Sequence, residues 1–280
     1  MSNNLLKGKK GIIFGALDEK SIAWITAIRC HEEGAEIVLT NAPVAMRMGE
    51  INKLAEQINA PVIPCDVSNG DDVDNLITKA MEHFGGGFDF VLHSIGMSLN
   101  VRKGKHYTEI DYGFNEKTLG ISSMSLHRVL ATCMKKDAIN NWGSVIALTY
   151  IAAQRVFPDY NEMADAKSLL ESVARSFGYH YGVKKQVRVN TISQSPTKTT
   201  AGSGVKGFDG FINYAEKMSP LGNASALDCA NYIVMMFSDL TRMVTMQNLF
   251  HDGGFSFTGV TQAVIERMET PQAPEAPSAP

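Results

Sequence analysis

The chain has 280 residues, of which 44% are apolar and 20% are charged, a composition typical of a water-soluble globular protein. This length suffices for one large α/β domain or two small ones, and it allows a sizeable core. The formal net charge of −3 leaves no basic surplus, so neither nucleic acid nor an anionic membrane is an expected partner.

The cysteines and the apolar runs further restrict the class of protein to which this chain can belong. The four cysteines lie far apart with no nearby histidine ligand set, so reduced thiols are favoured over a disulfide framework or a metal site. The first ten residues contain no apolar stretch long enough for a signal peptide. No run approaches the roughly 18 apolar residues of a membrane span. We therefore expect a cytoplasmic protein that needs no metal.

Short apolar runs alternate with longer helical patterns along the chain. Most of these runs are rich in β-branched or aromatic residues, as buried parallel strands tend to be. The expected strands span residues 11–14, 36–39, 61–64, 88–93, 144–148, 187–193 and 247–251. The clearest expected helices span residues 21–33, 71–84, 116–137, 160–181 and 226–238. This alternation predicts an α/β fold, a Rossmann-type doubly wound parallel sheet in a single domain.

Two segments do not fit the alternation. Residues 195–207 are rich in Gly, Ser and Thr and follow an expected strand end, where ligand sites of α/β sheets lie. We interpret residues 195–215 as a substrate lid, with a plain surface loop as the alternative. Residues 270–280 contain four prolines and are expected to be a disordered tail. The expected domain thus spans residues 1–258, followed by a C-terminal extension over residues 259–280.

A glycine turn follows the first expected strand. Gly15 ends that strand, and a helical pattern begins near Ser21. Such a turn can place the free N–H groups of a helix N-terminus against a pyrophosphate. Alternatively, the glycine can be present only because the backbone of a tight turn has no room for a side chain. Because the spacing is not Gly-x-Gly-x-x-Gly, it indicates nucleotide binding only weakly.

Polar residues follow other expected strands. Asp66 can accept a hydrogen bond from an adenine amino group, or it can simply act in a turn or helix cap. Gly96 would let the backbone approach a ribose, or form an ordinary turn. The second strand ends without the usual acidic partner of the ribose hydroxyls, and Arg47 is the nearest basic side chain. Charge therefore does not decide between NADH and NADPH.

Tyr160 and Lys167 are the most informative pair of residues. Seven positions are close to two helical turns, so both side chains are predicted to lie on one helix face. The cation favours negative charge on the phenol oxygen, and the phenol can donate a hydrogen bond to a developing oxyanion. Tyr181 and Lys185 have the Tyr-x3-Lys spacing of ordinary short-chain dehydrogenases. They lie at the expected C-terminal end of the long helix, which Gly182 is expected to terminate. A strand follows directly, so the pair is expected at the end of the sheet opposite the candidate site.

Together these motifs resemble the NADH-dependent enoyl-acyl carrier protein reductases of bacteria, members of the short-chain dehydrogenase/reductase superfamily. The six-residue gap between Tyr160 and Lys167 separates that family from ordinary dehydrogenases. The matching pieces run in order from about residue 7 to 256 and comprise Gly15-x5-Ser21-Ile-Ala, Asp66-Val67, His93-Ser-Ile-Gly96, Tyr150, Tyr160-x6-Lys167, Ser195-Pro-Thr-Lys-Thr199 and Phe250-His-Asp-Gly-Gly-Phe255.

The resemblance implies an activity and a set of site residues. NADH would deliver a hydride to the β-carbon of a trans-2-enoyl thioester on acyl carrier protein, in type II fatty acid elongation, with NADPH as an alternative cofactor. Catalysis would fall to Tyr150, Tyr160 and Lys167, with Tyr160 donating a hydrogen bond to the thioester oxygen. Implied cofactor contacts are Gly15, Ser21, Ile22, Ala42, Asp66, Val67, Ser94, Ile95, Gly96, Lys167, Thr197 and Thr199. Implied substrate contacts are Ser98, Met163 and Phe208. The family also implies a homotetramer.

Two other functions stay open at this point. A β-ketoacyl or carbonyl reductase of the same superfamily would need Tyr-x3-Lys beside the nicotinamide, but the fourth residue after Tyr160 is Ala164. A non-catalytic nucleotide-binding sensor would have little reason to keep Tyr150, Tyr160 and Lys167 together. We therefore favour the enoyl reductase.

Overall fold

Six parallel strands form the centre of the molecule. The structure is a computed structural model that describes residues 2–199 and 208–269. The strands run in the order β2-β1-β3-β4-β5-β6, so the chain reverses its direction of travel across the sheet between β1 and β3. This is the predicted Rossmann-type doubly wound sheet. The strand bounds are β1 Lys10–Phe14, β2 Glu36–Thr40, β3 Phe88–His93, β4 Ile139–Thr149, β5 Arg188–Gln194 and β6 Asn248–His251.

The strand expected at residues 61–64 is reduced to a single bridge. Val62 pairs with Leu39 in parallel fashion outside the named strands. Pro61 and Pro64 flank this point, and proline has no N–H to donate to a ladder. The apolar pattern therefore placed the segment correctly beside β2, but the prolines prevent a continuous strand.

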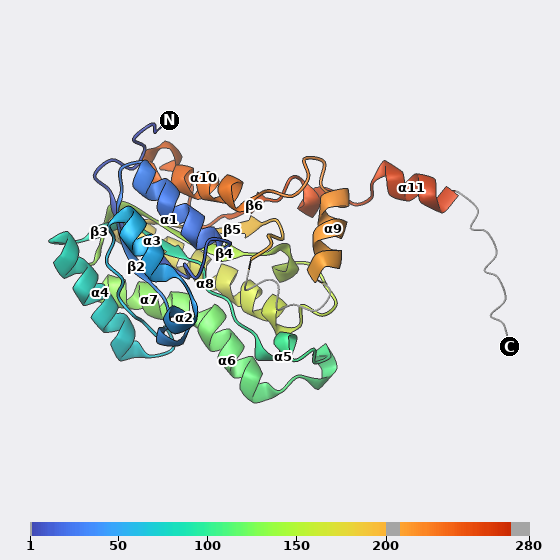
Figure 1. The fold of residues 1–280 in the computed structure, drawn as a ribbon, viewed down its shortest axis with the longest axis horizontal. Coiled ribbons are helices and arrows are strands. Elements are labelled where there is room, and N and C mark those ends of the chain that lie inside the picture. The colour runs from blue at the N-terminus through green and yellow to red at the C-terminus, as the bar shows by residue number, and fades with distance from the viewer. Residues whose placement is uncertain (1, 200–207, 270–280) are drawn as a thin grey trace.

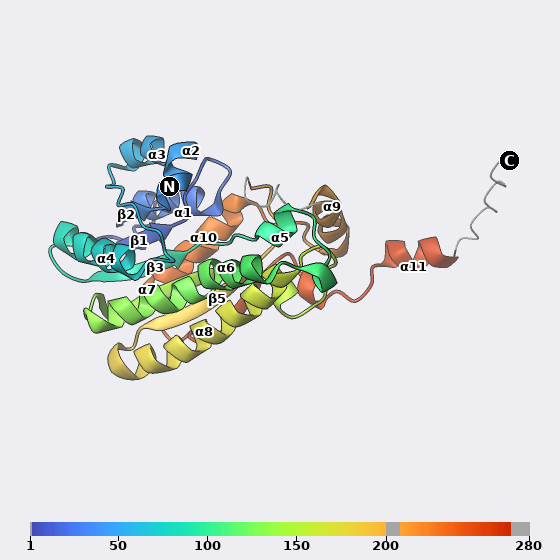
Figure 2. The same ribbon diagram turned by 90° about the horizontal axis from the view of Figure 1, so that it is seen from below.

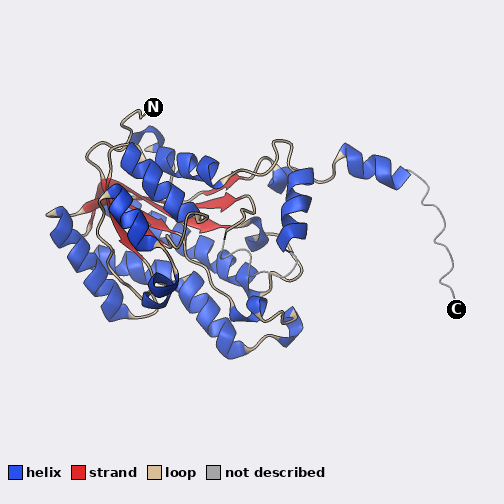
Figure 3. Cartoon of the chain, in the orientation of Figure 1, coloured by secondary structure: helices blue, strands red, loops and turns tan. Residues whose placement is uncertain are grey.

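Helices cover both faces of the sheet (Figures 1 and 3). One core lies under α1 (Ile22–Glu32), α3 (Ile51–Ile58) and α10 (Ala226–Phe237), and the other under α4 (Gly70–Phe84), α7 (Met124–Lys135) and α8 (Glu162–Lys185). Adjacent strand residues alternate between these cores, as Ile12 and Ile13 do. Strands β1 to β3 are mainly apolar because both faces are buried, whereas β5 is equally buried but carries polar side chains such as Asn190 and Ser193.

Helix α6 (Tyr112–Ser122) lies beside α8 (Figure 2). The sequence predicted one helix over residues 116–137, and the structure instead has α6 and α7 separated at Ser123, whose backbone leaves helical geometry. The Ser123 hydroxyl donates to the Ala166 carbonyl at 2.5 Å. This bond ties the break to α8 and explains why helical periodicity alone did not reveal it.

The long helix α8 differs from its prediction at both ends. It begins at Glu162 rather than Tyr160, and it continues past Gly182 to Lys185. The reading of Gly182 as a stop was therefore wrong, since glycine also fits a helix interior at a modest cost. The placement of Tyr181 was correct: its buried hydroxyl donates to Leu130 O at 3.2 Å, near the amino end of β5.

Several short elements were not predicted from the sequence. They are α2 (Pro43–Met48), α3 (Ile51–Ile58), α5 (Leu99–Arg102), α9 (Phe208–Met218), α11 (Gln262–Glu269) and single turns at Tyr107–Glu109, Ile151–Ala153, Asp239–Thr241 and Phe255–Phe257. Helix α11 buries none of its residues and stands apart from the body of the described chain (Figures 1 and 2). The tail predicted from about residue 270 lies outside the described residues.

All four cysteines are buried as free thiols. Within the described ranges, no helix is both long and apolar enough to cross a membrane. The same residues contain no cluster of three or more His, Cys, Asp or Glu side chains able to hold a metal ion.

Candidate active site

The turn after β1 lies directly against the turn after β3. Gly15 has a φ of +90°, and a Cβ atom there would lie 2.0 Å from the Ser94 carbonyl oxygen. Glycine is thus required for two reasons, the left-handed backbone and the contact itself. The two turns meet at the carboxyl edge of the sheet, beside the point where the strand order reverses, which is where doubly wound folds bind ligands.

The N-terminus of α1 opens next to this contact. Ser21 is the N-cap, and its hydroxyl oxygen accepts a hydrogen bond from Trp24 N at 3.2 Å. The first turn, which begins at Ile22, contains no acidic residue. No acid within that turn offsets its positive dipole end, which fits an anion such as a pyrophosphate.

Three implied adenosine contacts line the neighbouring strand ends. Ala42 is the N-cap of α2 in an extended conformation. The Asp66 carboxylate accepts hydrogen bonds from the Ser68 amide at 2.9 Å and from its hydroxyl at 2.6 Å. Val67 is buried, and its carbonyl accepts a hydrogen bond from Arg128. The structure thus gives Asp66 a role in a turn, and its contact with an adenine stays a prediction.

Lys167 lies beneath the segment that follows β3. Its ammonium group donates to the Leu148 carbonyl at 2.8 Å and lies 3.5 Å from the Ile95 carbonyl oxygen. A Cβ atom on Gly96 would lie 3.7 Å from Lys167 Nζ and 3.2 Å from Met163 Cε. The structure therefore brings together four of the residues that the family resemblance implied, namely Ile95, Gly96, Met163 and Lys167.

Burial governs the charge of Lys167. It lowers the pKa of the ammonium to about 8, and the Glu171 carboxyl four residues along α8 acts in the opposite direction. Glu171 is itself buried, accepts hydrogen bonds from Thr149 and Gln154, and has its pKa raised by burial. Near neutral pH the ammonium thus keeps its positive charge within a largely apolar surround.

The two tyrosines are adjacent. Tyr150 follows β4 directly, and its ring centroid lies 5.4 Å from that of Tyr160. Burial is the main cause that raises the pKa of each phenol, so both hydroxyls stay protonated and can donate hydrogen bonds. Tyr160 does not share a helix with Lys167 as predicted, because it precedes the N-cap Asn161 of α8.

A turn after β5 carries two of the implied cofactor contacts, Thr197 and Thr199. Ser195 N donates to His251 O at 3.1 Å, and Ser195 Oγ accepts from Ala224 N at 3.1 Å. The Thr197 hydroxyl donates to Ser195 O at 3.1 Å, and Thr199 N donates to Thr197 O at 2.7 Å. Residues 200–207 of the predicted lid, and the side chain of Phe208, lie outside the described residues.

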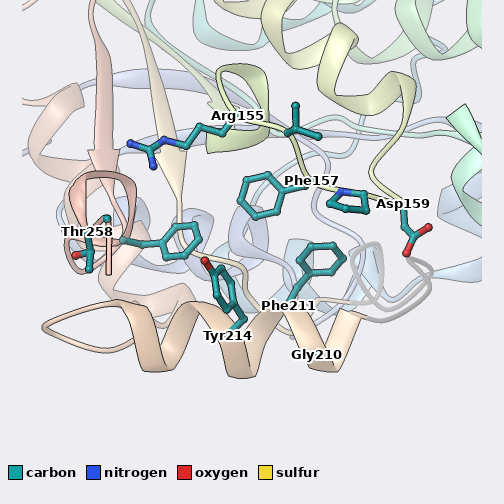
Figure 4. A pocket seen from close by; sticks show the side chains of 11 residues that line it. Arg155, Phe157, Asp159, Gly210, Phe211, Tyr214 and Thr258 are labelled. Atoms are coloured by element: carbon teal, nitrogen blue, oxygen red, sulfur yellow. The ribbon is translucent and has the colours of Figure 1, made fainter. Parts of the chain in front are cut away.

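An aromatic pocket of about 510 Å³ lies between residues 155–159 and α9. Figure 4 shows Phe211 directed from α9 toward Phe157, with Tyr214 on the same helix. The Phe157 ring centroid lies 5.3 Å from that of Tyr150 and 5.8 Å from that of Phe211. The pocket therefore borders the tyrosine pair and offers an apolar surface beside it.

Comparison with known proteins identifies the family of the chain. A family model described as Enoyl-(Acyl carrier protein) reductase matches residues 15–256. The chain belongs to this family.

Named relatives of the enoyl-(acyl carrier protein) reductase family cover most of the chain. It is 32% identical over 261 residues to enoyl-[acyl-carrier-protein] reductase [NADH] 2 of Rhizobium meliloti, covering 92% of this chain and 95% of that protein. It is 33% identical to the NADH enoyl reductase FabI of Rickettsia bellii, covering 94% and 100%. The FabI–NADH complex of Alistipes finegoldii is 64% identical, with a TM-score of 0.91 and coverage of 92% and 91%.

Sequence reasoning missed two buried acids and one aromatic residue of this candidate site. Glu171 could have been found from its i+4 spacing to Lys167, which places both on one helix face. Glu162, completely buried at the start of α8, lies in the expected first turn of a helix, where an acid is ordinary. Phe157 gave no signal, because its role depends on where α9 packs.

Proposed function

We propose that this chain reduces the trans-2 double bond of enoyl-acyl carrier protein thioesters with NADH in fatty acid elongation. The observation that carries the proposal is the pair of protonated phenols, Tyr150 and Tyr160, at the same sheet edge as the buried ammonium of Lys167. Membership of the enoyl reductase family supports it.

The residues present fit a dinucleotide. The Gly15 turn leaves no room for a side chain, the first turn of α1 contains no acid, and Lys167 offers a cation near the Gly96 backbone. NADH, when bound, supplies the hydride. We assign its pyrophosphate to the start of α1 and to Thr199, its carboxamide to Thr197, and its ribose hydroxyls to Lys167.

In this proposal the two tyrosines act on the thioester. Hydride addition to the β-carbon leaves an enolate, so negative charge collects on the thioester oxygen. The Tyr160 phenol donates a hydrogen bond to that oxygen and stabilises the charge as it forms. The enolate then takes a proton from water at the α-carbon, which completes the reduction. Tyr150, which packs against Tyr160, positions the thioester. The Lys167 ammonium keeps the local potential positive.

The acyl chain is assigned to the apolar surface next to the tyrosines. Met163 is buried beside Gly96, and Phe157 and Phe211 line the neighbouring pocket. We propose that Ser98 contacts the substrate through its backbone, since its hydroxyl caps α5 and donates to Glu162. Residues 195–215 would act as the lid.

We also propose that the protein is a cytoplasmic homotetramer whose catalytic domain spans residues 1–258. Large apolar side chains on α8, Tyr179 and Val183, are 60% and 72% exposed, and association with another copy would bury them. Four buried free thiols are compatible with a reducing compartment.

The deciding experiment follows oxidation of NADH and of NADPH with a crotonyl thioester and a β-ketoacyl thioester in parallel. Turnover of the enoyl substrate alone supports the proposal and shows the preferred nucleotide. Turnover of the keto substrate alone would replace it with a carbonyl reductase. Binding of NADH without turnover of either substrate would indicate a sensor.

A further inference from the structure

A completely buried carboxyl group lies two residues after Tyr160. Glu162 is 0% exposed. Its Oε1 accepts a hydrogen bond from the Ser98 hydroxyl at 2.6 Å and lies 3.1 Å from the Thr118 hydroxyl. Its Oε2 is buried without a hydrogen-bond partner among the described residues. Because burying such a group is unfavourable, its presence beside the tyrosine pair calls for an explanation.

The Ser98 hydroxyl joins Glu162 to helix α5. While it donates its proton to Glu162, its oxygen accepts the Val101 amide at 3.0 Å as the N-cap of α5. Val101 then packs in a small apolar cluster with Met163 and Ala166, against which the Tyr160 ring rests. The bond between Ser98 and Glu162 thus links α5 to the start of α8 beside Tyr160.

The turn that carries Tyr160 is held by the residues around it. Asp159 and Asn161 both have positive φ, +60° and +44°, which is unfavourable for residues with a side chain and requires support from the surroundings. Asn161 Nδ2 donates to the Lys105 carbonyl at 2.5 Å. Asn161 and Glu162, the two residues after Tyr160, therefore both attach to the segment 98–105.

We propose that Glu162 is a positioning residue, whose hydrogen bond to Ser98 fixes the Tyr160 phenol relative to the segment that carries Ser98. The inference rests on the proposed function, in which Tyr160 donates to the thioester oxygen and Ser98 lies beside the substrate. A displacement of about 1 Å in such an arrangement can cost about 100-fold in rate, so a rigid link between the two has a direct kinetic value.

The test compares two substitutions in the full chain. E162M removes the acceptor at similar length, and E162Q keeps an oxygen that can accept from Ser98. S225A is the matched control, because Ser225 is a side-chain N-cap on α10 just as Ser98 is on α5, and it has no role in the site. The readouts are kcat and KM for a crotonyl thioester, the Kd of NADH from fluorescence, and the Tm.

We expect E162M to lower kcat/KM for the thioester by about tenfold or more, while the Kd of NADH changes by less than about twofold. E162Q should recover most of this loss, and S225A should lose thermal stability without loss of kcat/KM. Adding S98A to E162M should produce little further loss, because residues that act through one bond are not additive.

Other results would overturn the inference. A folded E162M with the kinetic constants of the parent would show that the carboxyl group only fills space. Additive losses in S98A and E162M would show that they act independently. If E162M does not fold, S98A alone must still lose more kcat/KM than S225A, or the inference fails. A parent enzyme that is silent on the crotonyl thioester would instead refute the proposed function.

Discussion

Substituting Gly15 by alanine tests the placement of the cofactor at the turn between β1 and α1. The new Cβ atom would lie 2.0 Å from the Ser94 carbonyl oxygen, below the 3.0 Å at which such contacts begin to be observed. The turn or the carbonyl must therefore move by about 1 Å. The φ of +90° adds roughly 1–2 kcal/mol for a residue with a Cβ, and forced overpacking adds roughly 1–3 kcal/mol.

Gly8 provides the matched control for this substitution. Its φ is +75°, but a Cβ atom there would meet nothing within 4 Å, so G8A carries only the backbone term of roughly 1–2 kcal/mol. We expect G15A to lower the free energy of unfolding by roughly 2–5 kcal/mol and to raise the Kd of NADH by about tenfold or more, equivalent to 1.4 kcal/mol.

Urea unfolding and NADH fluorescence titration measure both quantities on the same preparations. G8A should lose stability without loss of NADH affinity. The reasoning is refuted if G15A is no less stable than G8A, because the contact with Ser94 would then be absent in solution. An unchanged Kd in a destabilised G15A would instead remove the pyrophosphate from this turn.

Four further outcomes follow from the site and the core. Tyr160→Phe should lower kcat about 100-fold with an unchanged Kd for NADH, and equal loss of both would contradict a role confined to the transition state. The affinity for NADH should fall as the pH rises through about 8, where the Lys167 ammonium loses its proton; Lys167→Met should bind weakly with no such dependence. Because the folded pKa of Lys167 is lowered below its unfolded value, the unfolded chain binds more protons between that pH and about 10.4. This group alone should therefore make the parent more stable with rising pH there, and pH-dependent melting of the parent and Lys167→Met checks the sign. Gly11→Ala would place a Cβ 2.2 Å from the Phe90 ring and should cost roughly 1–3 kcal/mol of stability with kcat unchanged, as calorimetry and turnover can show.

Local sequence was informative where one physical preference dominated. Strands such as β3 and β4 were found because parallel strands buried on both faces must be continuously apolar. The prediction at residues 61–64 was wrong because two prolines outweigh an apolar pattern. The helix was predicted to end at Gly182, but it continues to Lys185. The local sequence does not show whether packing against other elements will stabilise a helix beyond a glycine.

The site was only partly accessible from the sequence. The family resemblance implied Gly96, Met163 and Lys167 as site residues, and the structure places them next to one another. The contact of Tyr160 with Tyr150, at a ring distance of 5.4 Å, depends on the tight turn before α8, whereas the sequence suggested a helix. Glu162 had no signal at all, since its burial results from Ser98 and Thr118, which lie more than 40 residues away along the chain.

The burial of every native thiol has a practical consequence for spectroscopy. Cys30, Cys65, Cys133 and Cys229 are each 1% exposed or less, and burial raises the pKa of all four, that of Cys65 to about 12. Thiolate is the nucleophile in maleimide coupling, so we expect the native cysteines not to react with maleimide dyes. A single cysteine placed on the surface of α9 would therefore take up one fluorophore, without any prior removal of native cysteines, and report the movement of that helix in real time.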